Sequence, residues 1–265
     1  MSTEASLEPL LEVMDKLLSP DGCPWDRQQT HQTLKKYLIE ETYEVIDAID
    51  EEDMHKLCEE LGDLLLQIVF HAGLAKRAGK FGIEQVISGI TKKMVHRHPH
   101  VFGEAKVEEA AQVVELWEAI KQKEGNQEGQ PKSLLAGVPN YLPALQKAQK
   151  VQSKAALVGF DWPDASEAAL KVDEEWREVK SAWETEDLDK LQEELGDFIF
   201  AAVNTCRLLE FDAEETLRAA VDKFMSRFSF MEVRSGESGV PLAEMSLSQL
   251  DDLWDEAKSK EGKKK

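Results

Sequence analysis

Apolar residues recur along this chain at steps of three and four, which is the spacing of one face of an α-helix. Segments 37–49 and 54–64 show this pattern clearly, and the short acidic segment 50–53 separates them. The two apolar stripes consist of Leu38, Glu41, Val45 and Ala48, and of Met54, Leu57, Glu60 and Leu64. Because the connection is short, we expect the two helices to form an antiparallel hairpin. Glu41 and Glu60 would then face the interior of a helix pair.

The same pattern occurs a second time, which indicates a tandem duplication. The sequence of residues 59–63 recurs unaltered at residues 193–197, and the three glutamates of an EExxE motif recur at the same displacement of 134 residues. The second pair of stripes consists of Val172, Glu175, Val179 and Ala182, and of Leu188, Leu191, Glu194 and Phe198. Flanking markers recur at a displacement of 137, where segment 22–25 matches 159–162 and the Leu-Trp pair at 116–117 matches 253–254.

The duplication and the residue composition predict an all-α protein built from two helical-bundle modules. Between the repeats, segment 125–131 is rich in glycine and polar residues and ends in proline, as linkers often are. We therefore expect an N-terminal module at residues 1–124, a linker at 125–139 and a C-terminal module at 140–265. The chain has only 9 prolines and 15 glycines, and no run of alternating apolar and polar β-branched residues predicts a strand.

Charge and composition narrow the class of partner. The formal net charge is −20, which repels phosphate backbones and argues against nucleic acid as a partner. A small phosphorylated substrate stays compatible with this charge, because a bound divalent cation reverses the local sign. Apolar runs are too short to span a bilayer, so we expect no membrane partner. Three scattered cysteines and an acidic N-terminal segment predict a reduced, cytoplasmic protein without a secretory signal.

The paired acids are the candidate chemistry of the sequence. One helical turn separates Glu41 from Glu44 and Glu60 from Asp63, so a hairpin would bring four carboxylates together across one groove. Carboxylates facing a helix interface are costly unless a cation or a proton neutralises them. Hard oxygen ligands in this number suit Mg²⁺, with Mn²⁺ as a substitute. A glutamate-rich helix alone usually has a solvated face, but the duplication of the whole pattern favours two metal sites. The candidate ligands are Glu41, Glu44, Glu60 and Asp63, and Glu175, Glu178, Glu194 and Asp197.

An EExxE motif followed by ExxD resembles the signature of the MazG-type, all-α nucleoside triphosphate pyrophosphohydrolases, and segment 22–44 is similar to the two-domain bacterial members. The resemblance covers almost the entire chain. It implies a helical-bundle homodimer and Mg²⁺-dependent hydrolysis of ribo- and deoxynucleoside triphosphates at the α–β bond, which gives a monophosphate and pyrophosphate. It also implies that the second and third glutamates of EExxE and both acids of ExxD bind the metal. Similarity to the two-domain members favours the C-terminal module as the hydrolase.

The resemblance further points to a basic segment and a tryptophan after the metal-binding helices. Lys223 and Arg227 lie one turn apart and suit phosphate oxygens, although a solvated helix face would look the same. Trp254 is a candidate to cover the nucleotide, with ordinary core packing as an equal alternative. Lys171 is a weaker phosphate candidate. Glu174, the first acid of the second EExxE motif, is a candidate to orient the attacking water, or it simply faces solvent.

Parts of the sequence are also compatible with other kinds of protein. A non-catalytic helical scaffold that uses its acids for partner contact would be stable without Mg²⁺ and would not turn over nucleotides. A di-iron carboxylate bundle needs two ExxH pairs on core helices, and the single match, at Glu52 and His55, lies at the expected turn. His96, His98 and His100 could suggest a transition-metal site. However, Pro99 breaks helical spacing there, which favours a loop with exposed or phosphate-proximal histidines. No P-loop, GxSxG or HExxH motif is present.

Overall fold

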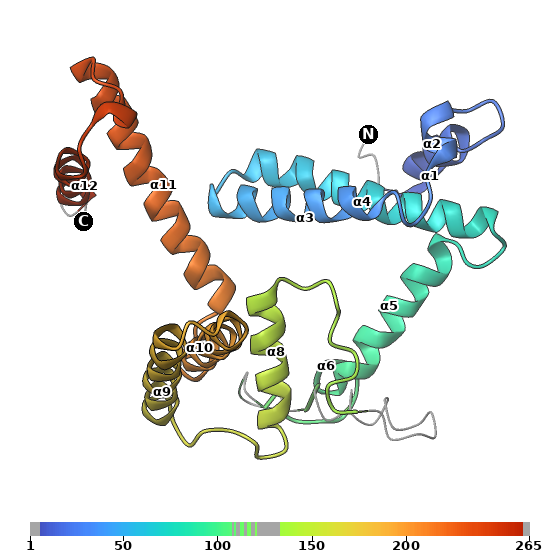
Figure 1. The fold of residues 1–265 in the computed structure, drawn as a ribbon. Helices are drawn as coiled ribbons and strands as arrows, with labels where there is room; N and C mark the ends of the chain where they lie inside the picture. The colour runs from blue at the N-terminus through green and yellow to red at the C-terminus, as the bar shows by residue number, and fades with distance from the viewer. Residues whose placement is uncertain are drawn as a thin grey trace. The chain divides into compact units, whose positions relative to one another are not determined.

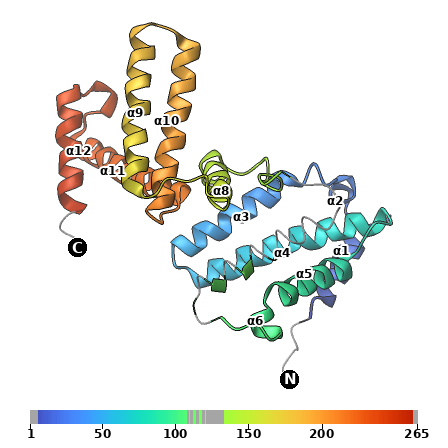
Figure 2. The ribbon, with the colours of Figure 1, turned by 90° about the horizontal axis from the view of Figure 1, so that it is seen from below.

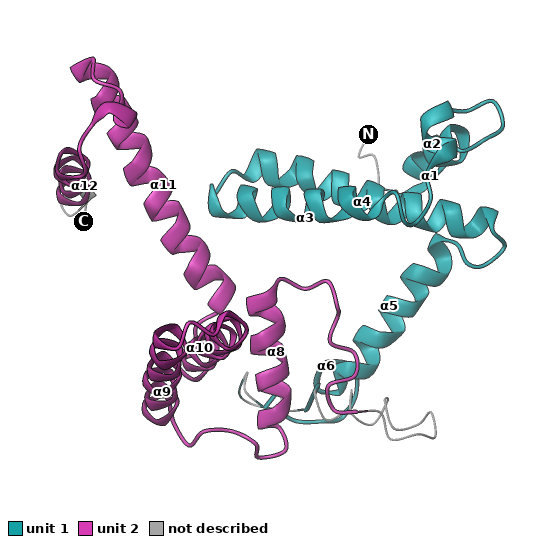
Figure 3. Cartoon of the chain, in the orientation of Figure 1, with its two compact units in different colours: residues 1–129 teal, residues 130–265 magenta. Residues whose placement is uncertain are grey.

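The computed structural model describes residues 6–107, 109, 112, 113, 116, 117, 120 and 133–261. Within these residues every regular element is a helix and no strand occurs, so the all-α prediction is confirmed. The chain divides into two compact units, residues 1–129 and 130–265 (Figure 3). This division falls inside the segment that we expected to be a linker, of which residues 125–132 lie outside the described part of the chain.

Unit 1 is built around a long helical hairpin and a short helix that packs on it. Its helices are α1 (Glu8–Leu17), α2 (Pro24–Gln28), α3 (Lys35–Asp50), α4 (Met54–Arg77), α5 (Ile83–Arg97) and α6 (Pro99–Phe102). The hydrophobic core lies where α1, α4 and the start of α5 meet, and it consists of Met14, Leu18, Leu34, Val69, Phe70, Ala72 and Ile83. Gly73 permits close packing of α4 on α1, since a Cβ at this position would lie 2.9 Å from Leu18 Cδ1.

Unit 2 repeats the hairpin and continues in a C-terminal arm, which spans residues 213–261. Its helices are α8 (Ala144–Ala156), α9 (Ala165–Glu184), α10 (Leu188–Leu208), α11 (Ala213–Ser238), the 3₁₀ turn η1 (Leu242–Glu244) and α12 (Leu247–Glu261). Helices α9 and α10 lie side by side over their whole length, and α12 folds back against α11 (Figures 1 and 2). Helix α8 packs on α10 and α11, where Gln149 Oε1 accepts a hydrogen bond from Ala213 N at 2.8 Å and Gln149 Nε2 donates one to the Phe211 carbonyl at 3.1 Å.

Both hairpins reverse direction through the same turn, 134 residues apart. Glu52 and Glu186 adopt left-handed backbone conformations with φ of 54° and 56°. The aspartate that follows each of them caps the next helix: Asp53 Oδ1 accepts from His55 N at 2.9 Å, and Asp187 Oδ1 accepts from Lys190 N at 3.1 Å. The hairpin predicted from the acidic segment 50–53 is therefore present in both units.

The structure bears out the apolar stripes apart from the first positions of those on α4 and α10. Leu38, Glu41, Val45 and Ala48 are buried or half-buried, as are their counterparts on α9. Met54 and Leu188 are exposed, because each is the first residue of its helix and lies at the tip of the hairpin. Within the described residues, no helix combines the length and the apolar character needed to cross a bilayer.

Candidate functional site

Three carboxylates meet between α3 and α4 in unit 1. Glu41, Glu60 and Asp63 each present an oxygen, and these atoms all lie within 4.8 Å of one another. Burial, followed by the charges of Asp63 and Glu44, raises the pKa of Glu41 above its usual value. Burial also raises the pKa of Glu60, and Glu44 and Asp63 add to the effect. These shifts mean that negative charge between the helices is incompletely compensated.

The buried amide of Gln67 contacts this set in unit 1. Its Nε2 donates to Glu41 Oε1 at 3.5 Å, a long hydrogen bond that lowers the pKa of Glu41 and only partly offsets the effect of burial. An amide stabilises an ionised carboxylate without cancelling its charge. The set in unit 1 therefore keeps its excess negative charge.

An equivalent set lies between α9 and α10 in unit 2. Oxygens of Glu175, Glu194 and Asp197 lie within 4.8 Å of one another. Glu175 is 6% exposed and Glu194 is 9% exposed, so two of these carboxylates are buried in the hairpin as the stripes predicted. Burial raises the pKa of Glu194, and the charge of Glu178 is the next largest contribution.

The fourth predicted ligand of each unit lies at the edge of its set. Glu44 and Glu178 are exposed, and neither belongs to the group of oxygens within 4.8 Å. Both nonetheless raise the pKa of a buried neighbour through their charge, Glu41 in one unit and Glu194 in the other. The structure thus brings three of the four predicted acids together in each unit and leaves the fourth nearby on the solvent side.

A lysine enters the carboxylate set of unit 2. Lys171 Nζ lies 2.6 Å from Glu175 Oε1 and 2.7 Å from Glu174 Oε1. The two carboxylates raise the pKa of Lys171, and Lys171 in turn lowers the pKa of Glu174. Unit 1 has Tyr37 at the corresponding position, 134 residues earlier, so its set lacks this internal cation. Lys171 therefore contacts the carboxylate set directly, through Glu175.

The donor set of each hairpin fits a hard divalent cation. All of its members are carboxylates that contribute oxygen, which is the ligand type that Mg²⁺ and Mn²⁺ prefer. Their raised pKa values show that an added positive charge would be favourable at this place. Among the described residues no histidine or cysteine joins either set, and this argues against a zinc or copper site.

The basic residues and the tryptophan of the C-terminal arm form a separate cluster. The Arg227 guanidinium carbon lies 5.3 Å from the centre of the Trp254 ring, and the Phe224 ring packs against Trp254 at 5.2 Å. Lys223 is exposed on the same helix. Arg97 contacts Trp117 in unit 1 in the same way, at 5.7 Å.

This cluster does not meet the carboxylates of unit 2. Helix α11 leaves the hairpin where α10 ends and runs across it rather than alongside it (Figures 1 and 2). Asp197 and Lys223 each lie about ten residues from the α10–α11 turn, roughly 15 Å along different helices. The structure therefore separates two predicted phosphate ligands, Lys223 and Arg227, from the predicted metal ligands of the same copy.

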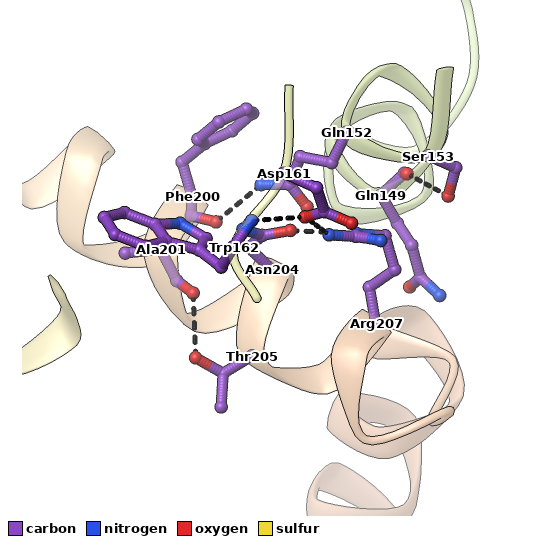
Figure 4. Close-up of polar contacts among 10 residues, drawn as sticks. All are labelled: Gln149, Gln152, Ser153, Asp161, Trp162, Phe200, Ala201, Asn204, Thr205 and Arg207. Atoms are coloured by element: carbon purple, nitrogen blue, oxygen red, sulfur yellow. Dashed lines mark hydrogen bonds and ion pairs between the residues drawn. The ribbon is translucent and has the colours of Figure 1, made fainter. Parts of the chain in front are cut away.

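A pocket beside the hairpin of unit 2 was not predicted from the sequence. Segment 159–162 was singled out only as a repeat marker, yet Trp162 lies against α10 near Asn204 and Arg207 (Figure 4). The available signal was a difference between the repeats: Asn204 corresponds to buried Phe70, and Arg207 corresponds to Gly73.

Comparison with known proteins shows similarity over most of the chain. Residues 29–102 and 165–229 match the family model of the MazG nucleotide pyrophosphohydrolase domain. The chain is 46% identical, over 95% of its length and 95% of the relative's, to a nucleoside triphosphate pyrophosphohydrolase/pyrophosphatase MazG of Thermotoga maritima. It is 41% identical to a nucleoside triphosphate pyrophosphohydrolase of Escherichia coli, with 96% of this chain and 98% of the relative covered.

Two further similarities concern partial matches. The protein YabN of Bacillus subtilis is 50% identical over 94% of this chain, which spans 51% of that longer relative. A crystal structure of a mazG-related protein from Thermotoga maritima is 31% identical, and the match covers 43% of this chain and 98% of that one with a TM-score of 0.38.

Proposed function

Because the chain belongs to the MazG nucleotide pyrophosphohydrolase family, we propose that it hydrolyses nucleoside triphosphates at the α–β bond, with Mg²⁺ or Mn²⁺ as cofactor. The products are a nucleoside monophosphate and pyrophosphate. The observation that carries this proposal is the set of three carboxylate oxygens within 4.8 Å in the α9–α10 hairpin. Glu175, Glu194 and Asp197 would hold the cation, with Glu178 joining them from the solvent side.

Phosphoryl transfer depends mainly on positioning and on charge stabilisation. A bound divalent cation supplies a Lewis acid for phosphate oxygens and lowers the pKa of a water ligand. Glu174 is exposed and its pKa is lowered by Lys171, so it is ionised and able to accept a hydrogen bond from the attacking water. In the reaction water adds across the α–β anhydride: its oxygen ends on phosphorus, the bridging oxygen leaves with the other phosphate group, and a proton is released.

Lys171 is placed to exchange partners when substrate arrives. In the chain alone its ammonium group is held by Glu174 and Glu175. A cation bound by Glu175 would compete with Lys171 for that carboxylate. The phosphate oxygens of a bound triphosphate would then be new partners for Lys171, within one helical turn of the acids. We assign Lys171 to a phosphate oxygen near the carboxylate set, and this residue is one reason to place the hydrolase in unit 2.

A second copy of the chain supplies the remaining phosphate ligands in this proposal. The apolar residues along α11 follow steps of three and four and are exposed, which is unusual for a soluble monomer. They are Leu217, Val221, Phe224 and Phe228. Burial of this stripe in a homodimer would explain its exposure in one chain, and it would carry the neighbouring Lys223, Arg227 and Trp254 to the partner's site. Trp254, which supports Arg227 here, would then cover the nucleotide.

The reaction is tested by product analysis. Each ribo- and deoxynucleoside triphosphate is incubated with the protein and Mg²⁺, and phosphorus NMR identifies the products. Monophosphate with pyrophosphate supports the proposal, whereas diphosphate with orthophosphate contradicts it. Absence of turnover would favour a helical scaffold.

The choice of unit is tested with a matched pair of variants. Glu178→Ala removes a ligand from unit 2, and Glu44→Ala removes its counterpart from unit 1. We expect turnover to be lost in the first variant and kept in the second. The reverse result would assign the hydrolase to unit 1.

The dimeric site is tested by complementation. Glu194→Gln and the double variant Lys223→Ala, Arg227→Ala are each inactive in this proposal. Refolded together they should regain part of the activity, because mixed dimers contain one site with all of its ligands. A mixture without activity would show that the two clusters do not share a site.

A further inference from the structure

Unit 2 contains a pocket that neither the carboxylate set nor the basic cluster uses. Helices α8 and α10 and segment 159–162 enclose a space of about 520 Å³. Phe160, Trp162 and Phe200 supply aromatic walls, and Phe160 is 82% exposed. Three aromatic rings around an open space are unfavourable in water unless something planar or apolar covers them.

The corresponding region of unit 1 is filled. Its core residues Met14, Leu18 and Phe70 are all buried. Unit 2 has smaller or polar residues at these positions, with Val151, Ala155 and Asn204 at displacements of 137, 137 and 134 residues. The pocket that remains between α1 and α4 has a volume of about 30 Å³. The space in unit 2 thus arises from specific substitutions in one repeat, and loose packing common to both repeats does not account for it.

Two polar side chains in the pocket hold unused hydrogen-bonding capacity. Gln152 is 7% exposed, and its Nε2 donates to the Phe200 carbonyl at 2.8 Å. Its Oε1 is buried and has no partner among the described residues. A buried acceptor without a partner is costly, so a ligand that donates here would bind favourably.

The neighbouring amide is fixed so that it offers a donor. Arg207 Nε donates to Asn204 Oδ1 at 2.9 Å, and the guanidinium of Arg207 also pairs with Asp161 (Figure 4). Because Oδ1 is engaged, the Nδ2 group of Asn204 is left to donate. Gln152 and Asn204 together present one acceptor and one donor beside aromatic walls.

The pocket lies one nucleoside length from the carboxylates. Asp197, Phe200 and Asn204 follow one face of α10 at steps of three and four, so Asn204 is roughly 10 Å along the helix from Asp197. On the antiparallel α9, Lys171 lies one turn from Glu175 in the same direction. The order along the hairpin is therefore carboxylates, lysine and aromatic pocket, which suits a nucleotide whose phosphates lie at the carboxylates and Lys171 and whose base lies in the pocket.

We propose that this pocket binds the base of the nucleoside triphosphate, an inference that rests on the function proposed above. The rings of Phe160, Trp162 and Phe200 contact the planar base. A donor group on the base edge donates a hydrogen bond to Gln152 Oε1. An adjacent acceptor on that edge accepts a hydrogen bond from Asn204 Nδ2. Each of the common bases presents a donor beside an acceptor, so the pocket selects for a base and ranks the bases by the fit of that edge.

The first test replaces Asn204 with phenylalanine, the residue that unit 1 has at the corresponding position, so that its ring fills the pocket. Asn204→Phe should lower kcat/KM for nucleoside triphosphates roughly tenfold or more, because base stacking and the edge contacts are lost. Inorganic triphosphate has no base, so its inhibition constant should not change in this variant. Gln192→Phe adds the same ring to an exposed position of α10 and should behave like the wild type, and thermal melting confirms that each variant is folded.

A second variant tests the edge contact itself. Asn204→Asp replaces the donor with an acceptor at constant size, and we expect it to change the ranking of the four bases by kcat/KM. A purely structural role of Asn204 would lower all four values by the same factor, and this outcome would overturn the proposal. The proposal would also be overturned if folded Asn204→Phe kept the wild-type kcat/KM for nucleoside triphosphates.

The two proposals fail in different ways. Calorimetry with nucleoside monophosphates measures the pocket without any turnover, and it should show binding that Asn204→Phe abolishes. If the wild type hydrolyses triphosphates but Asn204→Phe does not change the affinity for monophosphates, the base-pocket proposal is wrong and the proposed reaction stands. If monophosphates bind through Asn204 and no triphosphate is hydrolysed, the reaction is wrong and the pocket stands.

Discussion

The α3–α4 and α9–α10 hairpins carry the same acids on the same turns of the same kind of helix, but their surroundings differ. In unit 1 the neutral amide of Gln67 approaches Glu41, and the space beside the hairpin is filled by core side chains. In unit 2 Lys171 contacts Glu175, and the equivalent space is an open aromatic pocket. The carboxylate sets alone do not distinguish the two units, whereas Lys171 and the aromatic pocket, the groups that we propose to receive phosphate and base, do.

Removal of the same buried acid should affect the two hairpins very differently. Glu194→Gln should reduce turnover at least about 100-fold, since even groups that only support a metal ligand cost up to that factor when they are lost. Glu60→Gln should leave the rate unchanged, and steady-state assays with Mg²⁺ measure both. Equal losses in the two variants would mean that both hairpins take part in catalysis.

Exchanging residues between the repeats tests the difference in packing. Phe70→Asn places an amide in a buried core and leaves a cavity, so it should lower the free energy of unfolding by about 3–5 kcal/mol. The reciprocal Asn204→Phe should cost little, because the pocket has room for the ring. Denaturant unfolding measures both changes, and a large loss in Asn204→Phe alone would show that unit 2 is as tightly packed as unit 1.

Removing the internal cation of unit 2 makes the two carboxylate sets more alike. In Lys171→Met no ammonium competes for Glu175, so Mg²⁺ should bind unit 2 several-fold more tightly in the absence of nucleotide. Turnover should fall in the same variant, because a phosphate ligand is gone. Calorimetric titration with Mg²⁺ and a nucleotide assay separate these opposite effects. Unchanged Mg²⁺ affinity would show that Lys171 does not compete with the cation.

The smallest expected effect concerns a histidine that only unit 1 has. His71 Nδ1 lies 2.8 Å from His31 Nδ1, and Thr205 stands at the corresponding position of unit 2. Burial, with a smaller contribution from His31, lowers the pKa of His71 below 6.5. The unfolded chain therefore binds more protons than the folded one between that lowered pKa and 6.5. The contribution to stability is complete above pH 6.5 and is lost as the pH falls through this interval.

His71→Thr should flatten this pH dependence, which thermal melting between pH 5 and pH 8 would record. A matched substitution of His55, which is exposed at the tip of the hairpin, should leave the dependence in place. An unaltered slope in His71→Thr would place the acid sensitivity elsewhere in the chain.

Much of the fold could be predicted because helices have a short and regular period. The stripes through Glu41 and Glu175 fixed which faces turn inward, and the acidic turn before α4 implied a hairpin. The same spacing identified the three carboxylates that meet in each unit. Periodicity assigns a residue to a face, but it does not say how far from the axis a side chain reaches. Glu44 and Glu178 therefore stayed at the edge of sets in which they were expected to be equal members.

Other parts of the site depend on contacts that sequence spacing does not encode. The direction of α11 after the α10 turn separates Lys223 and Arg227 from the acids, and nothing in their own spacing reveals that direction. The pocket arises because Val151 and Ala155 on one helix and Asn204 on another are small or polar together. Such a space follows from the sum of side-chain volumes across an interface, which becomes visible only when the helices are placed.

A count of bound Mn²⁺ tests the central claim, that inward-facing carboxylates between paired helices hold a divalent cation. Electron paramagnetic resonance of free Mn²⁺, titrated with the protein near pH 7, gives the number of sites directly. We expect two sites in the wild type, one in Glu194→Gln and one in Glu60→Gln, with Mg²⁺ displacing Mn²⁺ from each. A wild-type protein that binds no Mn²⁺, or binding that neither substitution reduces, would contradict the account.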